Sequence, residues 1–202
     1  MRICITGAQS KIADEFICAI HQGRLPGFVI ERFSVSRHDT IPLGSDIYLL
    51  CHGLLHAKHF ADQSEAERRL SWYMNYDSHR TLIDAVMASN PVARVCVIGS
   101  ESGYRGSFDD GYATAKMLLH NYVETKRLPH PGQQLFAISP GIISDCGMTT
   151  RRADQDRVAE RIASHRKGRA VTADEVARLA AHVLMSQPFI SGTVIRMHGA
   201  NR

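Results

Sequence analysis

The sequence predicts an α/β protein with a doubly wound parallel sheet. Short runs rich in Val and Ile alternate along the chain with amphipathic stretches. Strands of this composition are typical of a parallel sheet that helices cover on both faces. No repeat, low-complexity tract or linker interrupts the 202 residues, so we expect one domain spanning residues 1–202.

The hydrophobic periodicity predicts six strands and five helices. The predicted strands are residues 2–6, 28–36, 46–51, 93–99, 134–139 and 193–197. The predicted helices are residues 12–20, 65–89, 112–126, 154–164 and 172–185, the last starting with a capping-box pattern at Thr172 and Glu175. Only eight residues, 38–45, lie between Arg37, which follows the second strand, and the start of the third. Because a parallel crossover usually takes about a dozen or more, either an extended chain crosses the sheet or one β–α unit is reduced.

The composition excludes several classes of protein. Apolar residues make up 44% of the chain and charged residues 22%, which argues against disorder or a collagen-like structure. No run approaches the roughly 20 apolar residues of a membrane span, and the one before Gly7 is too short for a secretory signal. Five cysteines without a C-x-x-C pair suggest no disulfide framework and hence a cytoplasmic protein. The net charge of +4 permits an anionic ligand, but no basic stripe indicates nucleic acid.

The turn after the first predicted strand, T-G-A-Q-S-K-I-A at residues 6–13, is a candidate site for a dinucleotide pyrophosphate. Backbone N–H groups and the positive end of a helix converge at this turn in doubly wound folds. Gly7 supplies the turn and Ser10 a hydroxyl, whereas Lys11 and Ala13 replace the second and third glycines of a G-x-x-x-G-x-G spacing. The Lys11 ammonium could contact a phosphate, although its Cβ crowds the approach. The alternative is a strand–helix turn without a ligand.

Ser36, Arg37 and His38 lie at the end of the second predicted strand. NAD sites commonly place an acidic residue there to hold the ribose hydroxyls, whereas a basic residue accommodates the 2′-phosphate of NADP. Arg37, with no acid at Ser36, therefore favours NADP(H) over NAD(H). The alternative is a solvated arginine at the end of a strand.

Four polar residues form a candidate catalytic set. Tyr112 and Lys116 lie one helical turn apart on the same predicted face. A cation near a phenol lowers its pKa from about 10, which makes the phenol usable as an acid or base near neutral pH. Ser100 ends the preceding strand, where doubly wound folds place their chemistry. Asn75 is a polar residue in an otherwise apolar helix and needs a partner.

Taken in order, these motifs resemble the single-domain branch of the short-chain dehydrogenase/reductase family, whose fold is Rossmann-like. The order runs T-G-A at residues 6–8, Cys51-His52-Gly53 where the family has N-A-G, Asn75, Ser100, Y-x-x-x-K at 112–116, and Pro140-Gly141 after a strand. The resemblance covers nearly the whole chain. The chain is shorter than the family's usual length, mainly on the side that would hold the adenine.

The resemblance implies a hydride-transfer site. Tyr112 would give its proton to a carbonyl oxygen, and Ser100 would hydrogen-bond the same oxygen. Lys116 would hold the nicotinamide ribose and depress the tyrosine pKa, and Asn75 would anchor a water that links Lys116 to solvent. The backbone of Ile143 would lie at the nicotinamide carboxamide. The expected cofactor-binding residues are Gly7, Ser10, Lys11, Ile12, Arg37, His38, Asp39, Cys51, His52, Gly53, Tyr112, Lys116, Pro140, Gly141 and Ile143.

The function implied by the resemblance is an NADP(H)-preferring oxidoreductase that interconverts a carbonyl and a secondary alcohol on a small molecule. The alternative is a catalytically inactive protein of the same fold that acts as a dinucleotide sensor or scaffold, which the altered glycine loop favours. Large apolar residues on the helices at 65–89 and 112–126 predict a homodimer or homotetramer.

Two groups of cationic or metal-binding residues remain. His52, His56 and His59 lie close in sequence but lack further ligands, so no metal site is expected. Residues 151–169 hold seven basic residues where the family carries its substrate lid. Arg151 and Arg152 fit an anionic substrate or the NADP phosphate, and the alternative is a solvated helix with internal ion pairs.

Overall fold

A six-stranded, wholly parallel sheet forms the centre of the molecule, in the order β2-β1-β3-β4-β5-β6. The structure is a computed structural model that describes residues 1–23, 27–35, 43–152 and 155–200. The strands are β1 (Arg2–Thr6), β2 (Val29–Phe33), β3 (Ile47–Leu50), β4 (Arg94–Ile98), β5 (Gln134–Pro140) and β6 (Thr193–Met197). The predicted doubly wound parallel sheet of about six strands is confirmed, although β2 is shorter than predicted.

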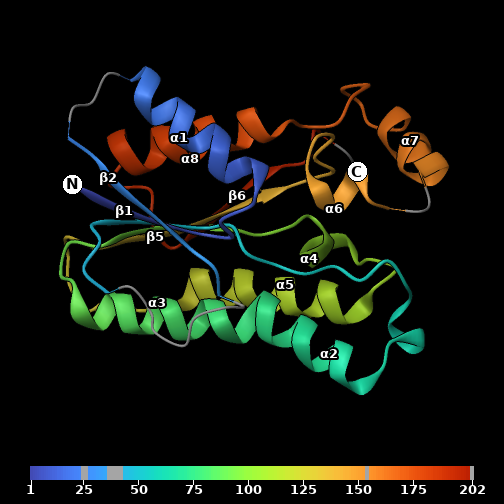
Figure 1. The fold of residues 1–202 in the computed structure, drawn as a ribbon, viewed down its shortest axis with the longest axis horizontal. Helices are drawn as coiled ribbons and strands as arrows, with labels where there is room; N and C mark the ends of the chain where they lie inside the picture. The colour runs from blue at the N-terminus through green and yellow to red at the C-terminus, as the bar shows by residue number, and fades with distance from the viewer. Residues whose placement is uncertain (24–26, 36–42, 153–154, 201–202) are drawn as a thin grey trace.

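Helices cover both faces of this sheet (Figure 1). One face carries α1 (Lys11–Gln22) and α8 (Ala173–Ser186), and the other carries α3 (Ser78–Ser89) and α5 (Asp110–Thr125), with α2 (Glu65–Trp72) leading into α3. The shorter elements are η1 (Phe60–Asp62), α4 (Ser102–Arg105), α6 (Gly147–Thr150) and α7 (Gln155–Ala163). Of these, η1, α4 and α6 were not predicted, because elements of three or four residues are too short to show a helical period.

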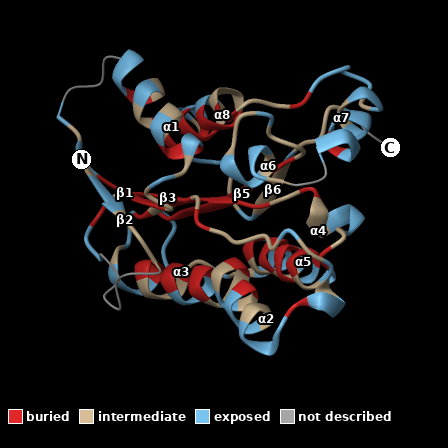
Figure 2. Ribbon diagram, turned by 45° about the vertical axis from the view of Figure 1, so that its right-hand side comes forward, coloured by how far each residue is buried: buried red, intermediate tan, exposed pale blue. Residues whose placement is uncertain are grey.

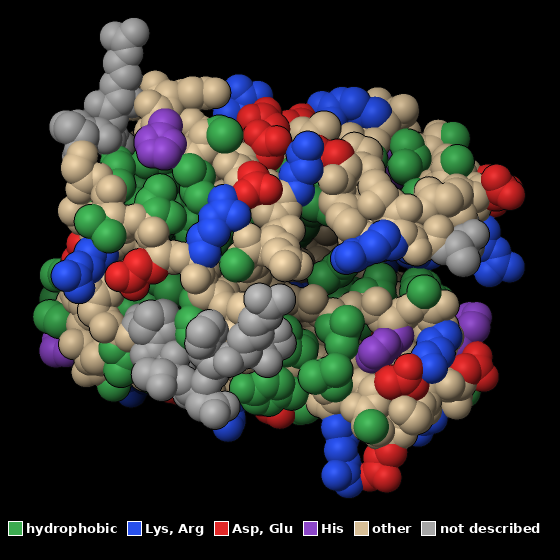
Figure 3. All heavy atoms as spheres, in the orientation of Figure 1, with side chains coloured by type: hydrophobic (Ala, Val, Ile, Leu, Met, Phe, Trp, Pro, Cys, Tyr) green, Lys and Arg blue, Asp and Glu red, His purple; other side chains and the backbone are tan. Residues whose placement is uncertain are grey.

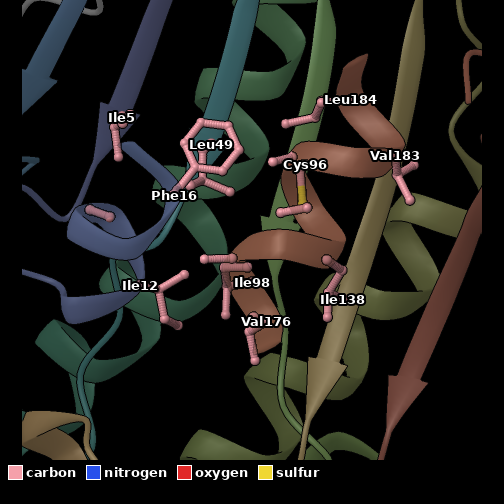
Figure 4. Packing of buried hydrophobic residues seen from close by; sticks show 14 of the residues in the cluster. Ile5, Ile12, Phe16, Leu49, Cys96, Ile98, Ile138, Val176, Val183 and Leu184 are labelled. Atoms are coloured by element: carbon pink, nitrogen blue, oxygen red, sulfur yellow. The ribbon is translucent and has the colours of Figure 1, made fainter. Parts of the chain in front are cut away.

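Side chains that alternate along each strand build one hydrophobic core on each face. Ile3 and Ile5 of β1 belong to the core under α1 and α8, whereas Cys4 between them belongs to the core under α3 and α5. Figure 4 shows the first core, where Phe16 of α1 packs over Leu49 of β3. The sheet and the inner faces of the helices are buried while the outer faces are exposed (Figure 2).

The winding of the sheet reverses between β1 and β3. The chain passes from β1 to β2 on one side, and then returns to place β3 on the other side of β1. The described residues of the link from β2 to β3 (34, 35 and 43–46) contain no helix or strand, and residues 36–42 of the link fall outside the described residues, so both alternatives for this link stay predictions. Ligands of doubly wound sheets bind beyond the carboxyl ends of the strands at such a switch point.

The predicted helix at 65–89 is interrupted by a π-helical turn, η2 (Tyr73–Asp77), between α2 and α3. Its central residue, Asn75, is fully buried. Single π-helical turns inside a helix are frequent at functional sites. The capping box predicted at Thr172 and Glu175 is confirmed at the start of α8.

Candidate active site

A cavity of about 580 Å³ opens at the carboxyl edge of the sheet, where Gly7 and Cys51, directly after β1 and β3, line it. Its lining comes from the segments that follow all six strands, and from η2 (Tyr73–Asp77), α5, α6 and α7. On the surface, a groove opens between the α6–α7 region and the α4–α5 region, to the right of the view in Figure 3. The cavity therefore lies where the topology of the sheet predicts a ligand site.

Most of the predicted site residues line this one cavity. They are Gly7, Ser10, Lys11, Ile12, Cys51, His52, Gly53, Ser100, Tyr112, Lys116, Pro140, Gly141 and Ile143. Asn75 lies outside the lining, behind the loop that follows β3. Arg37, His38 and Asp39 fall outside the described residues, so their predicted contacts at the adenine end stay predictions. Ser34 and Val35, which follow β2, line the cavity at that end.

Gly7 makes the turn between β1 and α1. Its φ of +70° lies in the left-handed region, and a Cβ there would stand 2.8 Å from the backbone of Cys51 and His52. The Ser10 N–H donates to the Gly7 carbonyl at 2.8 Å. Ser10 is the N-cap of α1, and its hydroxyl makes no capping hydrogen bond. A hydroxyl and a helix N-terminus therefore face the cavity together, an arrangement that fits a dinucleotide pyrophosphate.

Lys11, which replaces a glycine of the expected loop, has carboxylate neighbours. Its Nζ lies 3.8 Å from an oxygen of Glu15 and 3.8 Å from an oxygen of Asp145. Asp145 also accepts the N–H of Ala173 at 2.9 Å, at the start of α8. The repulsion that Asp145 would exert on a phosphate is thus offset by Lys11 and by the positive end of a helix.

Tyr112 lies in the first turn of α5 and is 6% exposed. The Asp109 carboxylate caps this helix by accepting the Tyr112 N–H at 3.1 Å, which fixes where the tyrosine enters the cavity. Burial raises the pKa of Tyr112 above its ordinary value, and a hydrogen bond with Ser100 opposes that shift. Asp109 was not among the predicted site residues, although an aspartate three residues before a helical tyrosine is a recognisable cap.

Lys116 is 2% exposed and lies one turn further along α5. Its Nζ donates to the carbonyl of Ile98 at 3.1 Å and lies 5.9 Å from the centre of the Tyr112 ring. Burial lowers the pKa of Lys116 to about 8. The resemblance implies that Lys116 lowers the pKa of Tyr112, but without a bound cofactor the pKa of Tyr112 is raised. Loss of hydration is the largest influence on this phenol.

The Asn75 amide clamps the loop after β3. Its Nδ2 donates to the carbonyls of Leu54 at 2.6 Å and Ser71 at 2.8 Å, while its Oδ1 accepts the Leu54 N–H at 3.1 Å. A Cβ on Gly53 would stand 3.0 Å from Asn75 Oδ1 and 3.6 Å from Lys116 Nζ. The absence of a side chain at Gly53 thus brings the asparagine and the lysine close together. The predicted role of Asn75 in anchoring a water stays a prediction.

The sequence predicts that only the backbone of His52 contacts a cofactor. The structure also places the His52 side chain in a buried hydrogen-bond network. Its Nδ1 lies 2.6 Å from Thr6 Oγ1 and its Nε2 lies 3.0 Å from Ser78 Oγ. The ring stacks on His79 with centroids 3.7 Å apart. Burial, followed by the charge of Lys116, lowers the pKa of His52 to about 3. Burial and the neighbouring His52 lower the pKa of His79 as well.

This histidine pair predicts a loss of stability in mild acid. Below about pH 6.5 an unfolded chain binds protons on histidines that the folded chain keeps neutral, so the free energy of unfolding falls as pH falls. We expect His79→Leu to reduce the slope by up to about 1.4 kcal/mol per pH unit below pH 6.5. Urea unfolding of both proteins from pH 8 to pH 5 measures this, with pH 8 as the reference. Parallel pH curves would contradict the prediction.

Two further residues link the carboxyl ends of the strands. Glu101 accepts two hydrogen bonds from Arg196, at 2.9 and 2.7 Å, and one from Ser139 at 3.2 Å, which joins β4, β5 and β6. His120 accepts the Ser100 N–H through Nε2 at 3.3 Å. His120 follows Lys116 by four residues, so its place on the same helical face could have been predicted.

The three neighbouring histidines of the sequence have separate surroundings. His56 lies 3.2 Å from the carbonyl of Glu67, and His59 contacts Phe108 edge to face. No group of three His, Cys, Asp or Glu residues within the described residues could hold a metal ion. No helix in the described ranges is long and apolar enough to cross a bilayer.

Comparison with known proteins shows the fold. No protein-family model and no curated protein matches the chain. A crystal structure titled short-chain dehydrogenase/reductase SDR: glucose/ribitol dehydrogenase, from Brucella melitensis, is 18% identical with a TM-score of 0.82, over 100% of this chain and 96% of that one. An oxidoreductase of the short-chain dehydrogenase/reductase family from Burkholderia thailandensis is 17% identical with a TM-score of 0.79, over 98% and 91%. The switch-point cavity and these likenesses together show that the chain has the fold of the short-chain dehydrogenases/reductases.

Proposed function

We propose that the protein is an NADP(H)-preferring oxidoreductase that interconverts a carbonyl and a secondary alcohol on a small molecule. One observation carries the proposal: Ser100, Tyr112 and Lys116 line the same cavity as the glycine turn at Gly7 and the N-cap Ser10. A proton donor, an oxygen-binding hydroxyl and a candidate phosphate site are thereby brought together from segments far apart in the sequence. The fold of the solved neighbours, which are described as oxidoreductases, supports the same activity.

Each residue has a proposed role in reduction. A nicotinamide dinucleotide, when bound, supplies the hydride. The Tyr112 hydroxyl gives its proton to the carbonyl oxygen, and Ser100 donates a hydrogen bond to the same oxygen as negative charge develops there. Lys116 Nζ has three N–H donors and uses one on Ile98, which leaves others for ribose hydroxyls. The pKa of Lys116, near 8, favours the charged form in neutral solution.

The segment after β5 offers backbone groups to the nicotinamide. Ile142 and Ser144 both pair with Val171, whereas the N–H and C=O of Ile143 make no hydrogen bond within the described residues. These free groups support the proposed contact of Ile143 with a carboxamide. Pro140 and Gly141 line the cavity beside it.

We also propose a homodimer or homotetramer in the cytoplasm, built from one domain. Leu70 of α2, Tyr73 of η2 and Met117 of α5 are large apolar residues that are about half exposed. Contact between copies of the chain through these helices would cover them. The five cysteines are free thiols, which is typical of a reducing compartment.

Calorimetric titration with NADPH, and separately with NADH, tests the proposed cofactor. We expect micromolar binding of NADPH and much weaker binding of NADH. Absence of binding for both up to millimolar concentration would overturn the oxidoreductase proposal. NADPH binding without reduction of any carbonyl compound would instead favour the dinucleotide sensor, the alternative to which the carboxylates around Lys11 lend some support.

A further inference from the structure

Four arginines line the cavity on the side of β4 and β5. Arg105 ends α4, Arg151 and Arg152 follow α6, and Arg161 lies on α7. These residues, the arginine cluster, line the same cavity as Ser100 and Tyr112. Lys and Arg side chains are visible on the upper lip of the groove in Figure 3.

The charge along this side of the cavity is strongly unbalanced. Glu101 is the only Asp or Glu among the described residues that line the cavity, and Arg196 and Ser139 already hydrogen-bond its carboxylate. Arg105 Nε lies 3.9 Å from the same carboxylate, so one acid faces two arginines. Within the ranges that the structure describes, Arg161 makes no ion pair, and Arg151 donates to the carbonyl of Gly147 at 3.0 Å.

The segment after β5 approaches the proposed phosphate turn at Asp145, which lies 3.8 Å from Lys11. Arg105 and Arg161 belong to α4 and α7 and both act on His165, whereas the glycine turn follows β1, and Ser34 and Val35 follow β2 at the edge of the sheet. Ser100 and Tyr112 follow β4, as Arg105 does, so Arg105 shares the side of the cavity that holds the candidate catalytic residues. A group bound by Arg105 and Arg161 would therefore belong to the substrate and not to the far phosphates of a dinucleotide.

Positive charge also acts on the histidines of the lining. His165 and His198 both line the cavity. Burial, followed by the charges of Arg105, His198 and Arg161, lowers the pKa of His165. Arg105 and Arg161 thus produce a positive potential at His165, as a site for an anion requires.

We infer that the substrate is a carbonyl or hydroxyl compound that carries a carboxylate or a phosphate, and that the arginine cluster binds this anionic group. The inference rests on the proposed function and narrows its substrate class. Guanidinium groups bind carboxylates and phosphates through paired, charge-assisted hydrogen bonds. Val158 of α7 and Met148 of α6 add apolar surface to the lining, which suits a carbon skeleton between the anion and the reacting carbon.

Three related aldehydes test the inference on the full-length protein. They are 4-formylbenzoate, its neutral methyl ester, and 4-formylphenyl phosphate. Calorimetry on protein saturated with NADP⁺ measures their affinities without consuming them. We expect one of the two anions to bind at least about tenfold more tightly than the ester, and the tighter anion to identify the preferred group.

Two arginine variants and one control test whether the arginine cluster causes the preference for the anionic aldehyde. Arg161→Gln and Arg105→Gln should each reduce the preference for the anion to within about threefold. Arg157→Gln removes the same charge from the same helix as Arg161 but does not line the cavity, and should keep the preference. Equal or unmeasurable binding of all three aldehydes, or a preference that survives in both cavity variants, would overturn the inference.

The same titrations without cofactor separate this inference from the proposed function. If NADP⁺ does not bind but the anions still bind in an arginine-dependent way, the oxidoreductase proposal fails and the anion site stands. If NADP⁺ binds and no preference for the anion is seen, the anion site fails and the oxidoreductase proposal stands.

Discussion

Tyr112→Phe is expected to lower kcat by about 10²–10⁴-fold while NADPH affinity stays within about twofold of the wild type. The change removes only the hydroxyl that hydrogen-bonds Ser100 and keeps the ring that fills a buried position. Proton donation to the carbonyl oxygen is lost, but the glycine turn, Ser10 and Lys116 are unaltered. The rate of NADPH oxidation with a reducible carbonyl compound, alongside calorimetry with NADPH, measures both quantities.

Tyr73→Phe is the matched control for this substitution. Tyr73 is 48% exposed on η2 and does not line the cavity, so loss of its hydroxyl should leave kcat unchanged. A Tyr112→Phe protein with a near-normal kcat would show that another group donates the proton.

Gly7→Ala is expected to destabilise the protein by about 2–5 kcal/mol and to weaken NADPH binding by at least about tenfold. Two costs add. An alanine at a φ of +70° is strained, and its Cβ would stand 2.8 Å from backbone atoms of Cys51 and His52, which cannot move without displacing the end of β3. Because the same turn would hold the pyrophosphate, the displacement also spoils the geometry of binding. Urea unfolding and calorimetry with NADPH measure the two effects.

Gly168→Ala is a control that introduces backbone strain at a positive φ without a steric clash. Gly168 has a φ of +62°, but a Cβ at this position would meet no described atom within 4 Å, so only the backbone strain of about 1–2 kcal/mol applies. The NADPH affinity of this variant should match that of the wild type. Equal destabilisation by the two substitutions would mean that the backbone contact at Gly7 contributes nothing.

Much of the candidate site could be predicted because its residues belong to local patterns. The spacing of Tyr112 and Lys116 on one helix, and the positions of Ser100 and Gly7 at the ends of predicted strands, are properties of neighbouring residues. The carboxyl ends of parallel strands lie at the same edge of a sheet. Residues that follow such strands, such as Gly7 and Ser100, are therefore expected to lie near one another. The cavity brings them together as expected.

Interactions between distant segments could not be predicted in the same way. Asn75 finds its partner in Leu54, 21 residues earlier, and His52 stacks on His79, which lies in another element. The spacing of Lys116 predicts a lowered pKa for Tyr112, but the pKa is raised. The cation is visible in the sequence, whereas the loss of hydration around the phenol is not. The convergence of Arg105 with Arg161 likewise depends on how α4 and α7 pack at the edge of the sheet.

The sequence by itself therefore determined the parallel sheet and the set of residues at its carboxyl edge, since hydrophobic periodicity and the positions of turns are local properties. Only the tertiary structure decided which side chains are buried, which of them pair, and what charge surrounds the cavity. Burial and pairing depend on segments far apart in the chain, and they set the energies of charged and polar groups.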